Sequence, residues 1–464
     1  MIAKAFLLTA SALSLGFLPL ALIAAEWYVD ASVPESGDGT TWERAFKTIQ
    51  HAIYSASSGD TVIVRAGVYP ENIGFAGKEI TVRSEDPDDF AVVAATVIDG
   101  QKLGPVVKFC SWEGAGAVLR GFTITNGKSD WGGGIYCDDS SPTIINNVIV
   151  SNEAWIGGGI YTNNSRSVIA NNVIARNSSS NNMGGIYCNL SSLKIAKNTI
   201  VYNTGFGVFC DYMCSATISN CIFLGNGSDL YSCSAVYSCL RRGDPLAGNI
   251  WAWPHFVAPD KNDYRLQSWS PCIDAGDPAS DFSREPQPNS GRIDMGAYGN
   301  TPNAVPASLD VDADGLPDDW EIRWFSDLSN TADGNPDGDS RTNIEELRKG
   351  SDPTTPSFVH VDWAATQEPD GLSWKTAFRR IQEGIEAAWD KDVVIVAPGR
   401  YREKVNFRGK AITLRSADPD DPEIVASTII DAEGSASAVT LNSGEGPDSV
   451  LSGFTITGGV YGVV

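Results

Sequence analysis

Apolar and polar residues alternate in short blocks that recur along the first half of the chain. Four blocks rich in β-branched residues end in asparagine, at 143–152, 168–177, 194–203 and 217–226, and the similar block 117–126 precedes them. Their last residues are 26, 25, 26 and 23 positions apart, and are Asn126, Asn152, Asn177, Asn203 and Asn226. This period is typical of a solenoid whose rungs bury their apolar faces only against neighbouring rungs. The pattern predicts an all-β fold, a parallel β-helix with asparagines hydrogen-bonded along the stack.

A longer repeat spans about a hundred residues without a gap. Its two copies are 332 positions apart and share Val29-Asp30 with Val361-Asp362, Gly77-Lys78 with Gly409-Lys410, and Gly121 to Thr125 with Gly453 to Thr457. We interpret this as a duplicated module.

The start of each copy has a different pattern. The spacing of Ala45, Phe46, Ile49 and Ile53 predicts a helix, and Thr61–Val64 and Ile80–Arg83 read as short strands. A helix here would cover the open end of the first rung, which otherwise exposes unpaired backbone.

These patterns predict four segments. Residues 1–25 have the layout of a secretory signal peptide, with Lys4, an apolar run and Ala24-Ala25. Residues 26–304 form the first β-helix with its N-terminal cap, 305–356 a linker, and 357–464 a second, truncated β-helix. Because the second copy stops where the first begins its regular rungs, we expect the sequence to be a fragment of a longer protein.

Composition narrows the possible partners. Asp and Glu total 57 against 34 for Lys and Arg, and the net charge of −23 disfavours binding to nucleic acid or anionic membranes. After the signal peptide no apolar run is long enough to span a bilayer, so the mature chain is expected to lack a transmembrane segment. We expect a monomeric protein that is either secreted or located at the cell surface or outer envelope.

Nine cysteines leave at least one unpaired. Cys137, Cys188 and Cys210 occupy one column of the rungs and are interpreted as buried thiols. Cys188 and Cys210 would lie close enough to bond, but aligned parallel side chains seldom give the required torsion. Better disulfide candidates lie near the end of the first solenoid and are Cys214, Cys221, Cys233 and Cys239.

The linker carries the strongest chemical signal. Residues 310–321 place oxygen ligands at the spacing of an EF-hand loop, with Gly315 at its tight turn, and residues 335–346 repeat the pattern with Ser340 in place of glycine. Six oxygen ligands in such a loop suit Ca²⁺. The predicted calcium ligands are Asp310, Asp312, Asp314, the Leu316 carbonyl, Asp318 and Glu321 in the first loop, and Asn335, Asp337, Asp339, Asn343 and Glu346 in the second.

Three resemblances follow from these motifs. The rungs resemble the right-handed parallel β-helix repeats of the pectate-lyase-like superfamily, and residues 270–298 resemble the end of choice-of-anchor β-helix proteins. Residues 310–353 resemble the calcium-binding thrombospondin type 3 or dockerin-like segments of bacterial surface proteins. Relatives with this layout are typically exported, and the rung motif implies a fold without implying a reaction.

An enzymatic hypothesis is polysaccharide cleavage by a lyase or hydrolase. A polyuronate lyase needs a cation and a basic side chain, for which Arg166, Arg176, Lys194 and Lys197 are candidates. They are scattered, a solvated face explains them better, and no pair of carboxyl groups has hydrolase spacing. The catalytic residues stay unknown.

A binding hypothesis rests on one outward face. Stacked aromatic rings beside amides and carboxylates can bind sugars. The candidate carbohydrate-binding residues are Trp131, Tyr136, Asp138, Trp155, Tyr161, Asn163, Tyr187, Asn189 and Asp211, with Phe209 continuing the aromatic column. Stacked aromatics are also ordinary β-helix structure. We expect an exported, calcium-stabilised β-helix protein that binds a polysaccharide or cell-surface glycan without catalysis, with a pectate-lyase-like enzyme as the alternative.

Overall fold

The computed structural model describes residues 24–241, 245–339, 341–355, 358–366, 369, 371–434 and 437–463. The predicted signal peptide therefore lies almost wholly outside the described residues. Among the residues described, none of the helices combines the length and apolar character needed to cross a bilayer.

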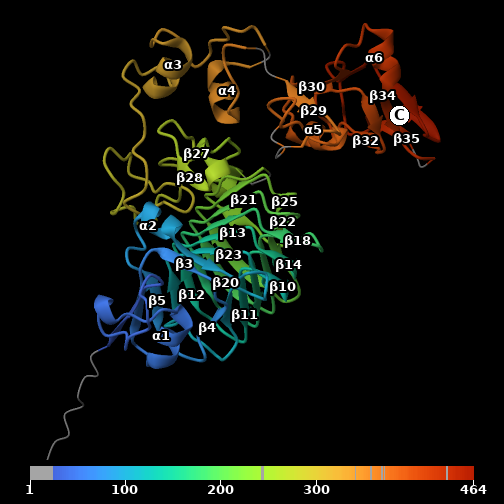
Figure 1. The fold of residues 1–464 in the computed structure, drawn as a ribbon. Helices are drawn as coiled ribbons and strands as arrows, with labels where there is room; N and C mark the ends of the chain where they lie inside the picture. Colours follow the sequence, from blue (N-terminus) through green and yellow to red (C-terminus); the bar gives the residue numbers. More distant parts are fainter. Residues whose placement is uncertain are drawn as a thin grey trace, which may run out of the picture.

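Residues 26–236 form a solenoid of parallel strands (Figure 1). Sheet 1 contains β1 (Glu26–Val29), β2 (Thr61–Val64), β5 (Thr81–Ser84), β8 (Val118–Arg120), β12 (Thr143–Ile145), β16 (Val168–Ala170), β20 (Ser192–Ala196), β23 (Ser215–Ser219) and β26 (Ala235–Val236). Sheet 2 contains β3 (Gly67–Tyr69), β6 (Thr96–Asp99), β9 (Thr123–Thr125), β13 (Val148–Val150), β17 (Val173–Ala175), β21 (Thr199–Val201) and β24 (Ile222–Leu224).

Two further sheets complete the solenoid, one along most of its length and one in three rungs. Sheet 3 contains β4 (Ile73–Gly74), β7 (Val107–Phe109), β11 (Ile135–Asp138), β15 (Ile160–Asn163), β19 (Ile186–Asn189), β22 (Phe206–Cys210) and β25 (Ser228–Tyr231). The short sheet 4 contains β10 (Lys128–Trp131), β14 (Glu153–Ile156) and β18 (Ser178–Ser179). In the middle rungs the chain visits sheets 1, 2, 4 and 3 in that order. The predicted β-helix is confirmed.

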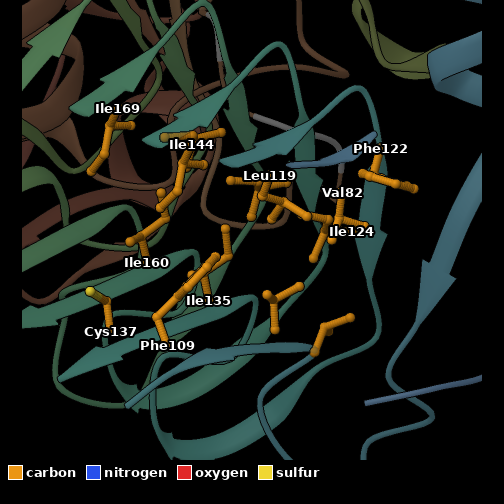
Figure 2. Packing of buried hydrophobic residues seen from close by; sticks show 14 of the residues in the cluster. Val82, Phe109, Leu119, Phe122, Ile124, Ile135, Cys137, Ile144, Ile160 and Ile169 are labelled. Carbon is orange, nitrogen blue, oxygen red and sulfur yellow. The ribbon is translucent and has the colours of Figure 1, made fainter. Parts of the chain in front are cut away.

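Stacking in register produces the core. Ile135 pairs with Ile160 and Ile160 with Ile186, so like side chains lie one above another. Figure 2 shows these inward-pointing residues filling the interior between the sheets, from Val82 to Ile169. Each rung buries its apolar side chains chiefly against its neighbours, which explains why the repeat is visible in the sequence.

The interior asparagines form two ladders. In the predicted one, the Asn152 side-chain amide donates to Asn177 Oδ1, that of Asn177 to Asn203, and that of Asn203 to Asn226, at 3.0 to 3.1 Å. Asn126 does not belong to it, because β9 pairs with β13 in a register that sets Gly127 below Asn152. The apparent period of 26 at that point hid a shift of one position.

A second ladder, which the sequence analysis missed, runs along the corner between sheets 1 and 2. Asn147 donates to Asn172 and Asn172 to Asn198, each at 3.1 Å. Cys221, Ser238 and Asn249 continue it with hydrogen bonds from backbone N–H groups. Because each amide also satisfies backbone carbonyls at the turns, both ladders are structural.

The helix at the start is shorter than predicted. Only α1 (Ile49–Ser55) is α-helical, preceded by the 3₁₀ turn η1 (Trp42–Arg44). Phe46 instead pairs its backbone with that of Tyr28 and Asp30, which keeps residues 45–46 extended. Ile49, Ala52 and Ile53 are buried, so α1 does cover the first rung.

Additional segments pack outside the solenoid. Helix α2 (Phe90–Ala95) lies beside sheet 2, and Asp89 caps it. The antiparallel hairpin of β27 (Phe256–Ala258) and β28 (Asp263–Leu266), with the 3₁₀ turns η2 (Pro245–Ala247) and η3 (Pro259–Lys261), follows the last rung. Tyr264, Cys272 and Met295 pack with Ile222 in a second apolar cluster on the outer side of sheet 2.

The linker folds around two short helices, α3 (Asp318–Phe325) and α4 (Asn343–Lys349), which share a small core of Leu316, Trp320 and Leu347. A second parallel-sheet region follows, with helices α5 (Ile381–Ala387) and α6 (Pro422–Ser427) and its own core. Its sheets are β29 (Val359–Val361), β30 (Val393–Val396), β33 (Thr413–Ser416) and β36 (Val450–Ser452); β31 (Gly399–Tyr401), β34 (Thr428–Asp431) and β37 (Thr455–Thr457); and β32 (Val405–Asn406), β35 (Ser437–Thr440) and β38 (Tyr461–Val463).

Within the described part of the chain one disulfide is present, between Cys188 and Cys214. Cys214 was predicted to be bonded, but its partner was not foreseen, because Cys188 aligns with Cys210 across β19 and β22. The turn after β22 returns Cys214 to Cys188, with 6.4 Å between their Cα atoms. Cys137 and Cys210 lie buried in the predicted column, with Thr162 between Cys137 and Cys188.

Candidate functional sites on the aromatic face and in the linker

Aromatic rings stack along the outer surface of sheet 3. Tyr136 stacks on Tyr161, Tyr161 on Tyr187, and Tyr187 on Phe209, with ring centroids 5.4 to 5.8 Å apart. Tyr231 continues the column 4.2 Å beyond Phe209. The parallel register places these rings directly above one another. The column is a continuous ridge whose rings range from the buried Tyr187 to the exposed Tyr231.

The polar residues predicted beside these rings form a hydrogen-bonded column. Asn163 donates to Asp138 at 2.8 Å and Asn189 donates to Asn163 at 2.9 Å. Tyr136 donates to Asp138 at 3.2 Å, and Tyr187 donates to Asp211 at 2.5 Å. Burial, followed by the nearby carboxylate, raises the pKa of Tyr136 to about 12. The phenols therefore stay neutral donors that hold the acidic side chains in place.

Two tryptophans stand beside this column. Trp131 and Trp155 lie on β10 and β14 of sheet 4, and 49% and 55% of their surfaces are exposed. The Trp131 ring lies 6.4 Å from that of Tyr161. Both shortly precede the glycines that turn the chain from sheet 4 into sheet 3, but they differ by one register position, because Trp131 pairs with Ile156. The result is an accessible aromatic strip beside fixed amide and carboxylate groups.

The four candidate bases lie in different environments. Arg166 and Lys194 are exposed, and Arg176 lies over the Tyr202 ring at 5.7 Å. Burial, followed by the charge of Lys194, lowers the pKa of Lys197. Asp281 and Glu285, in the segment after the solenoid, act on Lys197 in the opposite direction. The arrangement does not gather the four bases into one site.

The first linker loop brings its acidic residues together. Asp312, Asp314 and Glu321 each offer an oxygen within 4.8 Å of the others, and so do Asp310, Asp312 and Asp318. Glu321 is fully buried on α3, and both of its carboxylate oxygens lack a hydrogen-bond partner. Burial, followed by the neighbouring aspartates, raises its pKa to about 7. The Leu316 side chain packs in the linker core, and Gly315 has φ +97° at the tight turn.

The second loop has a similar arrangement. Asp337, Asp339 and Glu346 converge within 4.8 Å, and Glu346 is fully buried. One oxygen each of Asp337, Asn343 and Glu346 is buried without a hydrogen-bond partner. Asn335 instead bonds within its own turn, accepting from the Gly338 N–H at 2.9 Å. Ser340, which stands at the position of the turn glycine, lies outside the described residues.

A third acidic group was missed by sequence reasoning. Asp274, Glu285 and Asp294 converge within 4.8 Å beside the solenoid, although eleven and nine positions separate them along the chain. Glu285 accepts hydrogen bonds from the backbone of Asp294 and Asn300, and Asp294 accepts from that of Asp274. These hydrogen bonds connect distant parts of the segment 274–300 with one another. No spacing motif in the sequence indicates this acidic group, because the loop that joins its members is irregular.

Comparison with known proteins supports the fold. A family model described as a right handed beta helix region matches residues 107–240. The uncharacterized protein YwoF of Bacillus subtilis is 29% identical over 86 residues, and the alignment covers 18% of each protein. The match thus spans under a fifth of that relative, whose printed name gives no activity.

Two solved structures were also matched. The pectate lyase Pel9A is 15% identical with a TM-score of 0.27, and the alignment covers 59% of this chain and 96% of that one. A mutant of the PL6 family alginate lyase AlyGC is 11% identical with a TM-score of 0.17, over 93% and 71% of the two chains. Likenesses at these TM-scores carry no argument about activity.

Proposed function

We propose that this chain is an exported β-helix protein of the cell surface or outer envelope, which binds a polysaccharide through its aromatic face and is stabilised by calcium in its linker. The observation that carries the proposal is the pair of exposed tryptophans beside a fixed column of amides and carboxylates. Binding of glycan without catalysis is the function that this geometry serves best.

The aromatic strip has the features of a sugar-binding surface. Sugar rings present C–H groups that stack on flat aromatic rings, and their hydroxyls hydrogen-bond to amide and carboxylate groups. Trp131 and Trp155 supply rings in successive rungs, one register position apart, because β10 pairs with β14 so that Trp131 lies opposite Ile156. Neighbouring parallel strands are about 4.8 Å apart, so these two exposed rings on adjacent strands would both reach one extended sugar chain.

A glycan array followed by calorimetry tests this surface. We expect the double variant Trp131→Ala and Trp155→Ala to lose at least about tenfold in affinity, since stacking contributes on the order of 1 kcal/mol per ring. Trp112→Ala is the matched control, because Trp112 is 78% exposed and is not part of the face. Equal affinity of the double variant and the wild-type protein would contradict the proposed surface.

The linker loops have the donor set for calcium. Uncompensated carboxylates that are buried together are costly, and a cation that takes oxygen ligands removes that cost. Asp310, Asp312, Asp314, Asp318 and Glu321 would hold one ion, and Asp337, Asp339, Asn343 and Glu346 a second. The fully buried oxygens of Glu321, which have no partner, give the strongest support. Calcium here would be structural.

Terbium luminescence tests the first loop directly, because Trp320 adjoins Glu321 and can transfer excitation to a bound lanthanide. We expect Glu321→Gln to abolish the signal, and addition of EDTA to lower the Tm of the wild-type protein. Asp327→Asn, an exposed acid between the loops, is the control. A melt that EDTA leaves unchanged would refute the structural role of the ions.

One observation favours the lyase alternative. Lys197 has a lowered pKa, as a general base would require. Incubation with a panel of polyuronates, monitored by the ultraviolet absorbance of unsaturated products, separates the two functions. Product formed by the wild-type protein and lost in Lys197→Met would replace the binding function with catalysis.

A further inference from the structure

Six cysteines gather where the first solenoid meets the segment that follows it. Cys188 and Cys214 form the disulfide already described. Cys210 lies with its Sγ 3.3 Å from that of Cys188, and its thiol hydrogen-bonds to that of Cys233. Beyond the last rungs, the thiol of Cys272 hydrogen-bonds to that of Cys239. Each remaining thiol thus has one thiol neighbour that is not already bonded.

The architecture explains both contacts. Cys210 ends β22, which pairs with β25 through Phe209 and Tyr231, so the chain after β25 passes beside Cys210. Cys233 lies in that turn and packs against the solenoid core. Cys239 bridges Ile222 at the edge of sheet 2, and Cys272 lies in the same outer apolar cluster. Both contacts join elements that are distant in sequence.

We propose that Cys210–Cys233 and Cys239–Cys272 are disulfides of the oxidised protein, which with Cys188–Cys214 fasten the last rungs and the following segment into one unit. Each bond forms when a thiolate attacks an external disulfide and the second thiol resolves the mixed disulfide. Two thiols and one small-molecule disulfide become one protein disulfide and two small-molecule thiols. The inference rests on the proposed export only for the oxidising compartment in the cell.

Three cysteines stay reduced. Cys110 is exposed, and Cys137 is buried with its thiol donating to the Ser140 carbonyl at 3.1 Å. Cys221 occupies a position in the second asparagine ladder, where it accepts from the Asn198 N–H. Both buried thiols therefore have structural roles without a bond. Nine cysteines less six leaves three free thiols, whereas one disulfide alone would leave seven.

Thiol counting gives the first test. The purified chain is equilibrated with oxidised and reduced glutathione, denatured, and titrated with a chromogenic disulfide. We expect three thiols per chain, and seven would overturn the proposal. Because the oxidant is added in vitro, this result does not depend on export or on glycan binding.

Peptide mapping without reduction gives the second test. Chymotrypsin cleaves after large aromatic residues and leucine, and so places the four cysteines of the two proposed bonds on different peptides; the cleavage sites that matter are Phe209, Tyr212, Phe223, Tyr231, Tyr237 and Trp269. We expect linked peptides that join Cys210 to Cys233 and Cys239 to Cys272. Linkage of these cysteines to other partners, or their recovery as alkylated thiols, would overturn the pairing.

Variants give a physical readout. Cys239→Ser with Cys272→Ser should lower the Tm of the first module by about 10 °C relative to the oxidised wild-type protein, because the bond closes a loop of more than thirty residues. Reduction should lower the Tm of the wild-type protein, and it should lower the Tm of this variant by a smaller amount. Cys110→Ser is the control and should have no effect. An equal response of wild-type and variant proteins to reduction would contradict the Cys239–Cys272 bond.

Discussion

The two copies of the duplicated module hold their first helix by the same contacts but are attached differently. In the first copy Glu71 accepts from the backbone N–H groups at the start of α1, and Lys78 donates to the Ile53, Tyr54 and Ala56 carbonyls at its end. In the second, Glu403 and Lys410 make the same contacts with α5. A short helix that cannot persist alone is thus held at both ends by charged side chains.

One acidic position separates the copies. Asp60 accepts from three neutral groups, the Ala25 and Ser57 N–H and the Trp27 indole. Its equivalent, Asp392, keeps the contact from the N–H of Trp389 but also pairs with Arg341 and Lys349 of the linker. The same carboxylate binds the preceding backbone in one copy and docks another segment in the other. The acid that binds nearby backbone groups in the first copy therefore forms an interface with the linker in the second.

The largest expected effect is at this acid. Asp392→Ala removes the carboxylate that pairs with the buried side chains of Arg341 and Lys349 and should reduce stability by about 4 kcal/mol, whereas Asp60→Ala should cost about half as much because its lost partners are neutral. Chemical denaturation of each variant measures the difference. Equal losses would show that the linker contacts of Asp392 do not hold in solution.

A smaller effect concerns the attachment of the linker to the first copy. His255 Nε2 lies 2.7 Å from the Leu347 carbonyl of α4, and burial, with Arg323 nearby, lowers the pKa of His255 to about 4. The unfolded chain binds the proton first as the pH falls, so stability should be constant above about pH 6.5 and fall by about 3 kcal/mol towards pH 4.

Denaturation across this pH range measures the loss. The variant His255→Gln should lack this share of the acid sensitivity, and His51→Gln is the control because no such burial surrounds His51. Identical pH profiles for His255→Gln and the wild-type protein would exclude His255 as the titrating group.

The smallest effect tests the likeness of the copies. Lys78→Met and Lys410→Met each remove three charge-assisted hydrogen bonds to helix carbonyls and should cost about 2 kcal/mol in their own module. Circular dichroism during denaturation follows both. A loss in one copy and none in the other would show that the repeated caps are not equivalent in energy.

The sequence predicted the repeated parts of the fold well, because stacked rungs impose the same burial on each repeat. It failed where a contact depends on a turn, as in the pairing of Cys188 with Cys214. The assignment of Asn126 to the ladder was wrong for another reason: this rung pairs with the next at a constant spacing of 25, which places Gly127 opposite Asn152. The start of α1 was misplaced because Phe46 satisfies its backbone with a strand.

The candidate sites also divide into those that a repeat or motif in the sequence predicts and those that depend on irregular turns. The linker ligands follow a spacing motif, so their convergence could be foreseen from the sequence, whereas the group formed by Asp274, Glu285 and Asp294 has no such motif. The aromatic column could be located because it repeats. The tryptophans and polar residues along that column were predicted too, but the exposure of the rings and the hydrogen bonds among the polar side chains depend on how the rungs stack.

Rung length in this solenoid is set almost entirely in one place. Nine positions separate the sheet 1 register partners Val168, Lys194 and Thr217 from the ladder asparagines Asn177, Asn203 and Asn226. From Asn152, Asn177 and Asn203 to the sheet 3 register partners Ile160, Ile186 and Val208 the distances are eight, nine and five positions. That stretch carries Trp131 and Trp155, so insertions there leave the register of the stack intact. It is the natural graft point for evolving or engineering new recognition on an unchanged scaffold.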